Sequence, residues 1–444
     1  MNMYKPQLTD YIVALDIGTT KVCAVVGRKT EYGKLEILGV GRVESTGVSR
    51  GVVSNIERTV KAIADAIAAA EARANVKITD VFVGIAGQHI KSLQHSGMVT
   101  REAIQEEISR RDIDRLINDM SRLVLPPGDR ILHVIPQEYT VDNEQGILDP
   151  IGMSGIRLEA NFHIVTGQDT AIKNIYRCIE RANYRVANLT LEPIASAAAV
   201  LSDEEKEAGV VLVDIGGGTT DIAIFYEGII RHTAVIPFGG NVITKDIKTG
   251  CSIMQHQAES LKVKFGSALA EGLIDNRIFG IPGLKGHDPK EISERNLAMI
   301  IEARMEEIID RVYYEIRQSG FERKLIGGIV LTGGGALLND LTKLFELGTG
   351  MVTRVGFPID HLAHGYTEEV CSPVYATSIG LLIKGYEDLD AGRVQLTNSI
   401  NATLDDETLD HEHPSNATPA SGSFLANIFG AVKNFFEAEP DRDI

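Results

Sequence analysis

The chain has 444 residues, of which 44% are hydrophobic and 24% charged, an ordinary globular composition with enough length to bury a core. Its formal net charge of −17 argues against a general nucleic-acid-binding role, because neutralising phosphates requires clustered lysine and arginine. No apolar run approaches the roughly 18 residues of a membrane-spanning helix, and the N-terminus lacks the apolar stretch of a signal peptide, so we expect a cytosolic protein.

The first part of the chain predicts a strand that ends in a glycine turn. The apolar run 11–15 leads into Asp16-Ile-Gly-Thr-Thr20. Further strand-like runs at 22–27 and 35–43 precede an alanine-rich stretch at 54–75, whose apolar residues have helical spacing.

Residues 87–163 interrupt the lobe pattern. Within that interruption, residues 102–122 predict an amphipathic helix, and residues 131–136 and 139–141 predict strands. We expect an inserted α+β module here.

A second copy of the first pattern starts about 200 residues after the first. The apolar run 210–213 leads into Asp214-Ile-Gly-Gly-Gly-Thr-Thr220-Asp221, and strand-like runs follow at 224–226 and 229–235. Such an internal duplication predicts two lobes that face one cleft.

The last ordered elements are a strand that ends in Thr332-Gly-Gly-Gly335, a helix from Ala336, and an apolar helix at 373–383. Residues 391–422 are polar and predict a disordered linker, and residues 423–437 turn apolar again.

Glycine turns after strands let backbone N–H groups approach phosphate oxygens closely. Threonine hydroxyls add donors, whereas carboxylates near phosphate make sense if a hydrated Mg²⁺ bridges them. A single Asp-x-Gly-x-Thr loop could equally be a tight turn between strands. Two copies at lobe spacing, together with the third glycine turn, favour a clamp on one polyphosphate.

These motifs resemble those of the actin–Hsp70–sugar kinase superfamily, a two-lobed α/β fold built on duplicated ribonuclease-H-like sheets. The resemblance implies ATP and Mg²⁺ as cofactors, phosphate motifs at Asp16–Lys21 and Asp214–Asp221, an adenosine motif at Gly333–Gly335, and connecting helices at 192–201 and 373–383. The nucleotide-binding residues it implies are Asp16, Gly18, Thr19, Thr20, Lys21, Gly216, Gly217, Gly218, Thr219, Thr220, Glu259, Lys262, Gly333, Gly334 and Gly335. The residues it implies for Mg²⁺, through water, are Asp16, Asp214 and Asp221.

Three further positions have two interpretations each. Glu192 would orient the attacking water, or it would stabilise a helix N-terminus beside Pro193. Glu259 and Lys262, which share a helical face, would contact the nucleoside or form a surface ion pair. The resemblance leaves enzymatic activity open, with at most weak ATP hydrolysis.

The strings 81–89, 132–139, 150–157 and 230–240 narrow the resemblance to the FtsA family of bacterial cell-division proteins, over nearly the whole chain. That resemblance implies the family's SHS2-type subdomain as the insertion. The boundaries it implies are 1–86 and 164–200 for the first lobe, 87–163 for the insertion, 201–236 and 310–390 for the second lobe, and 237–309 for an upper subdomain of the second lobe.

The end of the chain predicts an amphipathic helix. At about 100° per residue, its large apolar side chains fall within an arc of roughly 140°. These residues are Phe424, Leu425, Ile428, Phe429, Val432, Phe435 and Phe436. Such a helix fits a membrane interface, with docking onto the protein's own core or a partner groove as the alternative. Lys433 is its one basic residue, so apolar burial must supply most of the affinity for lipid.

The family resemblance implies an ATP-binding adaptor that polymerises on the cytoplasmic face of the cell membrane at the division site. It would anchor FtsZ filaments by their C-terminal tail, recruit later division proteins and bind no nucleic acid. Arg304 is a candidate contact for the acidic FtsZ tail, unless it simply pairs with Glu307. The alternatives are a pilus-assembly adaptor of the same fold and, less favoured, a superfamily kinase.

Overall fold

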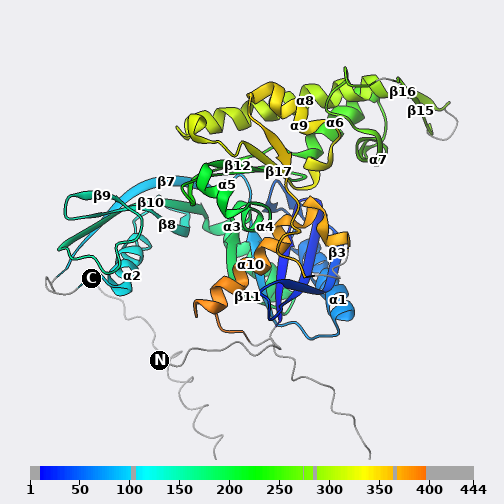
Figure 1. The fold of residues 1–444 in the computed structure, drawn as a ribbon. Coiled ribbons are helices and arrows are strands. Elements are labelled where there is room, and N and C mark those ends of the chain that lie inside the picture. The colour runs from blue at the N-terminus through cyan, green and yellow to red at the C-terminus, as the bar shows by residue number, and fades with distance from the viewer. Residues whose placement is uncertain (1–10, 102–106, 274, 284–287, 364–367, 397–444) are drawn as a thin grey trace, which may run out of the picture. The chain divides into compact units, whose positions relative to one another are not determined.

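The computed structural model describes residues 11–101, 107–273, 275–283, 288–363 and 368–396 (Figure 1). The predicted linker from residue 397 onward and the predicted terminal helix at 423–437 lie outside these residues. None of the helices in the described part of the chain is long and apolar enough to cross a membrane.

The first lobe is built on a five-stranded sheet in the order β11-β6-β1-β2-β3. Its strands are β1 (Tyr11–Ile17), β2 (Lys21–Lys29), β3 (Leu35–Glu44), β6 (Asp80–Ile85) and β11 (Arg185–Leu191). β1 is buried along its whole length because helices cover both faces of the sheet. Tyr11, Val13 and Leu15 pack with α1 (Ile56–Ala74) and α3 (Asp169–Arg181), whereas the alternate side chains point to the opposite face.

The second lobe repeats this plan with a sheet in the order β14-β13-β12-β17-β18. Its strands are β12 (Val210–Ile215), β13 (Thr220–Tyr226), β14 (Ile229–Ile236), β17 (Ile329–Thr332) and β18 (Thr353–Val355). In both lobes the first two strands form an antiparallel hairpin, and a parallel strand flanks the first of them. The repeated hairpins predicted from the duplicated motif are therefore present.

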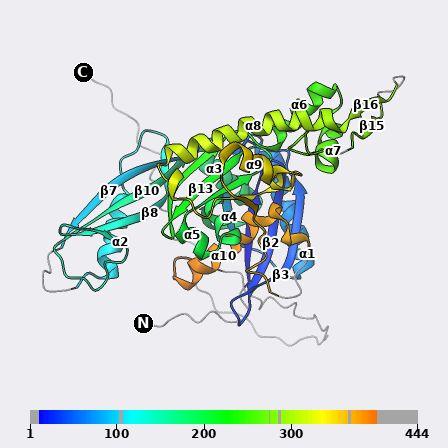
Figure 2. The same cartoon turned by 45° about the horizontal axis from the view of Figure 1, so that its top comes forward.

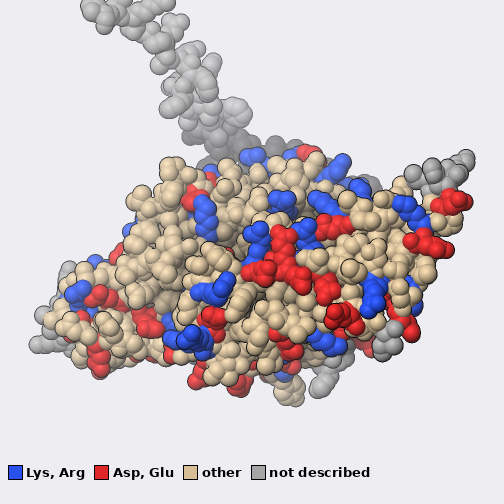
Figure 3. All heavy atoms as spheres, turned by 90° about the horizontal axis from the view of Figure 1, so that it is seen from above, with Lys and Arg blue, Asp and Glu red and all other residues tan. Residues whose placement is uncertain are grey.

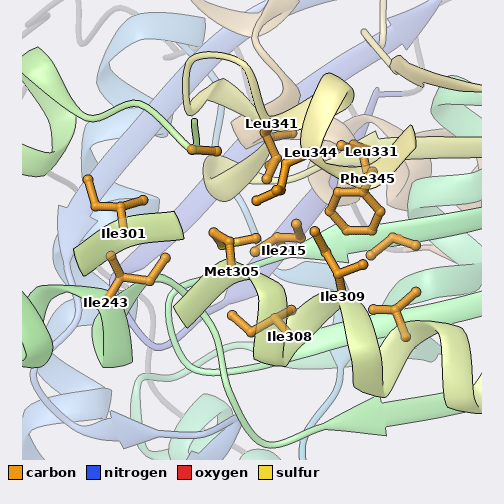
Figure 4. Close-up of a cluster of buried hydrophobic side chains, with 14 of the residues drawn as sticks. Ile215, Ile243, Ile301, Met305, Ile308, Ile309, Leu331, Leu341, Leu344 and Phe345 are labelled. Carbon is orange, nitrogen blue, oxygen red and sulfur yellow. The ribbon is translucent and has the colours of Figure 1, made fainter. Parts of the chain in front are cut away.

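One face of the second sheet is covered by α6 (Gly240–Cys251), α8 (Glu294–Gln318) and α9 (Leu341–Thr349). Figure 4 shows Met305, Ile308 and Ile309 of α8 meeting Leu344 and Phe345 of α9 in this core. Figure 2 shows how α8 runs along this layer. The chain between α6 and α8 forms α7 (Gln255–Phe265) and a hairpin of β15 (Ile278–Ile281) and β16 (Lys290–Ser293).

Two helices connect the lobes, α4 (Glu192–Val200) and α10 (Ala376–Asp390). Their apolar side chains share one buried cluster with Ile12 of the first sheet and Leu212 of the second. The helices touch closely, since a Cβ added to Gly380 would lie 1.8 Å from the carbonyl oxygen of Ala195. The prediction of an apolar helix at 373–383 is confirmed in substance: a 3₁₀ turn at Pro373–Tyr375 precedes α10.

The insertion has its own sheet, in the order β7-β10-β8-β9, and its own apolar core. Its strands are β7 (Lys91–Thr100), β8 (Asp129–Val141), β9 (Glu144–Ile147) and β10 (Arg157–Gln168), and its helix is α2 (Arg110–Met120). The chain leaves the first lobe after β6 and returns through β10 directly into α3.

Two predicted element bounds within the insertion are wrong. Of the helix expected from residue 102, residues 102–106 lie outside the described residues and residues 107–109 are not helical; the helix begins at Arg110, where the Ser109 backbone N–H donates to the Asp112 carboxylate at 2.9 Å. The two strand-like runs at 131–141 form one strand, β8, with a register shift where Pro136 faces Phe162 of β10. Pro136 has no N–H to donate, and the irregularity accommodates it.

A third expectation, a helix starting at Ala336, is also wrong. Residues Gly334–Leu337 form a 3₁₀ turn, and the α-helix α9 starts only at Leu341. Gly333 has a φ of 79°, which lies outside the range of a right-handed α-helix, so no α-helix runs through this residue.

The insertion also contacts the outermost strand of the second sheet, β14. Gln137 Nε2 donates to the carbonyl oxygen of Ile230 at 2.9 Å, and Ser92 Oγ donates to that of Thr233 at 3.0 Å. The ring of buried His163 lies 3.0 Å from the Thr233 hydroxyl, measured from Nε2 to Oγ1. These contacts tie the insertion, which grows from the first lobe, to the sheet of the second lobe.

Candidate functional site

Two hairpin turns carry the predicted phosphate-binding residues. In the first, the Gly18 N–H donates to the Lys21 carbonyl at 2.9 Å and closes the turn between β1 and β2. In the second, the Gly216 N–H donates to the Thr219 carbonyl at the same distance, between β12 and β13. The two turns therefore have the same construction, as the duplicated motif predicts.

The two turns face and touch each other. A Cβ added to Gly217 would lie 2.3 Å from Cγ2 of Thr20, and one added to Gly218 would lie 2.5 Å from Oγ1 of Thr19. Real Cβ atoms essentially never come so close, so a side chain at either position would force Thr19 or Thr20 to move. The structure thus brings together two loops that are about 200 residues apart in the sequence.

The third glycine turn packs against the second loop. Gly333 has φ 79°, and a Cβ on it would lie 2.3 Å from Oδ1 of Asp214. A Cβ on Gly335 would lie 2.3 Å from Cγ2 of Ile215, whereas one on Gly334 would meet nothing closer than 3.9 Å. The backbone of this turn is therefore placed directly beside the carboxylate of the second loop.

Asp214 and Asp221 lie opposite each other on β12 and β13, and both are buried. Burial raises the pKa of Asp214, a hydrogen bond from Ser196 Oγ at 2.7 Å opposes the rise, and the charge of Asp16 adds to it. Burial and the charge of Asp214 raise the pKa of Asp221 to about 8, against a 2.9 Å hydrogen bond from Thr219 Oγ1. The other Asp221 oxygen, Oδ1, is buried without a hydrogen-bond partner.

Glu192, the first residue of α4, completes this acidic group. The residue as a whole is partly exposed, but protein atoms surround its carboxyl; this desolvation raises its pKa well above the usual range, and the charges of Asp16, Asp221 and Asp214 raise it further. A Cβ added to Gly84 would lie 2.9 Å from its Cγ. Because Glu192 also precedes a proline in the first turn of α4, both interpretations of this residue fit the geometry.

Lys21 is the cation at this site, and it forms an ion pair with Asp16. Burial lowers the pKa of Lys21, but Asp16, Cys23 and Glu192 together outweigh burial, so the net shift is upward and the ammonium stays charged. One lysine thus lies close enough to the carboxyls of Asp16, Glu192 and Asp214 to influence them. Within the described ranges, no group of three or more His, Cys, Asp or Glu is spaced to ligate a metal ion directly.

Glu259 and Lys262 lie on α7 and form the ion pair that their spacing predicts, at 2.8 Å. Lys262 Nζ also donates to the Gly240 carbonyl and to Thr244 Oγ1, both at 2.9 Å. Gly240 in turn donates its N–H to the Gly216 carbonyl at 2.9 Å. The pair is therefore linked to the second loop through the N-terminus of α6, and it is more than an isolated surface pair.

Arg304 lies on α8, away from the two loops. It forms ion pairs with Asp246, at 2.5 Å, and with Glu307, and about a quarter of its side chain is exposed. The pairing with Glu307 that the sequence offers as the alternative is thus present. Basic and acidic side chains are interspersed on the face shown in Figure 3, without a broad basic field on that face.

Sequence reasoning missed two hydroxyl groups beside the second loop. Ser196 Oγ on α4 donates to Asp214, and it lies 3.0 Å from Oγ1 of Thr377 on α10. The available signal was a small hydroxyl residue within the apolar part of each helix, Ser196 in α4 and Thr377 in α10. A third missed contact is the Gly51 N–H, which donates to Oγ1 of Thr19 at 3.2 Å.

Comparison with known proteins adds to this geometry. Residues 211–380 match the family model of cell division protein FtsA, and residues 87–166 match that of the SHS2 domain inserted in FtsA. The chain is 43% identical over 382 residues to the cell division protein FtsA of Pseudomonas aeruginosa, a match that covers 86% of this chain and 90% of that protein.

Two solved structures are similar in fold at low sequence identity. The PilM–PilN type IV pilus biogenesis complex gives a TM-score of 0.62 at 14% identity, over 84% of this chain and 98% of that chain. MreB5 of Spiroplasma citri bound to ADP gives 0.52 at 17% identity, over 87% and 99%. The predicted two-lobed, actin-like α/β fold with an inserted SHS2 subdomain is therefore confirmed.

Proposed function

The chain belongs to the FtsA family of cell-division proteins, and from this premise we propose that it is an ATP-binding, filament-forming adaptor that anchors FtsZ to the membrane. The family resemblance inferred from the sequence is confirmed, and with it a role in cell division. The observation that best supports the nucleotide part of the proposal is the contact between the two glycine loops, Thr19 and Thr20 facing Gly218 and Gly217.

ATP would lie with its phosphates between the two loops. Backbone N–H groups of the loops and the hydroxyls of Thr19, Thr20 and Thr219 would donate to phosphate oxygens, and the turn at Gly333–Gly335 would lie at the adenosine. The loops touch in this structure, so the phosphate chain fits only when they separate. A protein of the same fold, MreB5, bears ADP, which supports a nucleotide as the ligand.

The acidic group fits a hydrated cation. Four carboxyls lie close to one another with Lys21 beside three of them, and Asp221 Oδ1 is a buried acceptor without a donor, which is the environment a cation stabilises. Asp16, Asp214 and Asp221 would hold Mg²⁺ through water, and the ion would neutralise phosphate charge when bound.

Glu192 supports slow turnover of ATP. Burial and the neighbouring carboxyls of Asp16, Asp221 and Asp214 raise its pKa, which reduces the fraction of the side chain that is ionised and able to accept a proton. We therefore propose that ATP acts mainly as a conformational clamp on the filament, with weak hydrolysis at most.

The partner contacts are further parts of the proposal. The FtsZ tail would bind the subdomain at 237–309, where a tail carboxylate at Arg304 would have to compete with Asp246 and Glu307. The helix at 423–437 would hold the filament on the cytoplasmic face of the membrane at the division site, where later division proteins join. The pilus-assembly alternative rests on fold likeness alone, and the kinase alternative predicts phosphoryl transfer to an added substrate.

Nucleotide binding is tested by titrating the protein with a fluorescent ATP analogue in Mg²⁺. We expect saturable binding by the wild type and its loss in Asp214→Ala, because the variant lacks a buried carboxylate at the loop contact. Asp203→Ala, the same change at an exposed residue of α5 (Asp203–Ala208), should bind as the wild type does. Unchanged affinity in Asp214→Ala would contradict the assigned site.

The adaptor role is tested by sedimentation with liposomes in ATP, with and without FtsZ. Full-length protein should pellet and carry FtsZ with it, whereas a chain that ends at Gly422 should stay in the supernatant. If both chains stay soluble, the terminal helix serves another contact and the membrane role fails.

A further inference from the structure

The short turn between β4 (Val48–Ser49) and β5 (Val52–Val53) touches the first phosphate loop. Its two central residues, Arg50 and Gly51, both have positive φ, 50° and 73°. The Gly51 N–H donates to Oγ1 of Thr19 at 3.2 Å. A threonine hydroxyl that accepts from a backbone N–H keeps its own proton free, so this contact aims Thr19 as a donor.

The other side of the same turn touches the start of the insertion. A Cβ added to Gly51 would lie 2.5 Å from Cα of Gly87 and 2.8 Å from the carbonyl oxygen of Ala86. Gly87 has φ 125°, and a Cβ on it would lie 3.0 Å from the Gly51 carbonyl oxygen. The two backbones are therefore in direct contact, and a side chain on either glycine would force them apart.

Gly87 stands where the chain enters the insertion, since the SHS2 match covers residues 87–166. Gly167 stands where the chain leaves it. His89 lies between the two: its Nδ1 would be 3.0 Å from a Cβ on Gly87, and its Cδ2 would be 3.5 Å from a Cβ on Gly167. We call Gly87, His89 and Gly167 the hinge.

In the hinge, the buried side chain of His89 makes no hydrogen bond with any described residue. It is 4% exposed, and neither ring nitrogen has a hydrogen-bond partner. A buried polar group without a partner is costly, so an arrangement that gives His89 a partner competes more easily with the observed one.

We propose that Gly51 is a positioning residue for the first phosphate loop and that its turn couples this loop to the hinge of the insertion. The inference rests on the proposed function, because it takes a polyphosphate as the ligand between the loops. Thr19 lies against Gly218 of the second loop, so entry of a phosphate chain between the loops displaces Thr19. The hydrogen bond to Gly51 and the contact of Gly51 with Gly87 carry that displacement to the hinge.

Coupling between two sites is reciprocal: if ATP changes the hinge, a change at the hinge must alter the affinity for ATP. This consequence separates a coupling role from a structural one. Gly87 lies outside the residues assigned to ATP, and a merely structural glycine there would not affect ATP affinity in a folded protein.

The test compares Gly87→Ala with Gly33→Ala in the full-length protein. Both glycines have positive φ, 125° and 76°, but a Cβ at Gly33 would meet nothing within 4 Å. Affinity is measured with a fluorescent ATP analogue in Mg²⁺, and amide hydrogen exchange is followed at residues 86–92 and 164–169 with and without ATP. We expect ATP to alter exchange at both segments of the wild type. Gly87→Ala should change the affinity about five-fold or more and lose this response, whereas Gly33→Ala should behave as the wild type.

A second variant, His89→Leu, keeps the test informative if Gly87→Ala fails to fold. Leucine removes the two unpartnered nitrogens, so the observed hinge becomes more stable, the thermal midpoint rises and ATP affinity falls. A raised midpoint with unchanged affinity would mean a structural role only and would overturn the proposal. ATP binding by the wild type without any exchange change at the hinge would overturn it too, while the nucleotide site stands. No ATP binding at all would overturn both.

Discussion

Replacing Asp221 by asparagine should stabilise the ligand-free protein while it removes Mg²⁺-dependent nucleotide binding. Asparagine keeps a carbonyl oxygen for the 2.9 Å hydrogen bond from Thr219, and it removes an acidic group whose ionisation is unfavourable beside Asp214. We expect this carboxyl to lower the stability of the ligand-free wild type and to stabilise the proposed cation when the cation is bound. The variant thus separates stability from function at one side chain.

The expected size follows from the pKa. Burial and Asp214 raise the pKa of Asp221 from 3.8 to about 8, so the folded protein holds a proton that the unfolded chain releases between these values. Stability therefore falls as pH rises through this window, by about 1.4 kcal/mol per unit. Asparagine lacks this dependence, so its advantage should be on the order of 3 kcal/mol at pH 6 and 5 kcal/mol at pH 8. These are upper limits, because an ionised buried carboxylate draws in water.

The assay is urea unfolding followed by circular dichroism at pH 6 and pH 8, in EDTA and without nucleotide. Asp119→Asn, the same change on the exposed face of α2, is the matched control and should leave the midpoint unchanged at both values of pH. The reasoning is refuted if Asp221→Asn is no more stable than the wild type at pH 8, or if its advantage does not grow between pH 6 and pH 8.

Three other predictions concern separate parts of the chain. Gly333→Ala should lower stability by about 1–3 kcal/mol in thermal unfolding, because its φ is 79° and its Cβ would lie 2.3 Å from a buried carboxylate oxygen; Gly334→Ala, with open space, is the control. Burial lowers the pKa of His163 to about 4, so the wild type should lose up to about 3 kcal/mol as pH falls from 6.5 to 4, and His163→Gln should flatten this loss in urea unfolding. Phe429→Asp should release the protein from liposomes, whereas Asn427→Asp, on the polar face, should not; retained binding in the first variant would contradict the interfacial helix.

The duplicated loops could be predicted from the sequence because a hairpin turn is a local structure. Asp, Gly and Thr at fixed spacing after an apolar run predict a turn without reference to the rest of the chain. The repeat of this pattern predicts that two such turns exist. Their contact, Gly217 against Thr20, then follows from the lobe duplication. The ends of helices and strands were harder to predict from the sequence. The 3₁₀ turn after Gly333 is an example, because the φ of this glycine affects where the next helix starts.

Contacts between distant segments that belong to no repeat could not be predicted from the sequence. The pairing of Arg304 with Asp246 joins residues 58 positions apart, and no spacing rule connects them. The contact of Gly51 with Gly87 could not be predicted either, because a glycine in a sequence does not indicate which other segment lies against it. Ser196 became meaningful only when α4 placed it beside Asp214.

The contact between the insertion and β14 has a consequence for how the chain keeps itself soluble. β14 is the last strand of its sheet, and its outward carbonyls at Ile230 and Thr233 are occupied by donors from Gln137 and Ser92. An uncovered border of this kind accepts a strand from another molecule and so promotes aggregation. A protein without residues 87–166 would expose that border, so the insertion protects the rest of the chain against unwanted β-pairing.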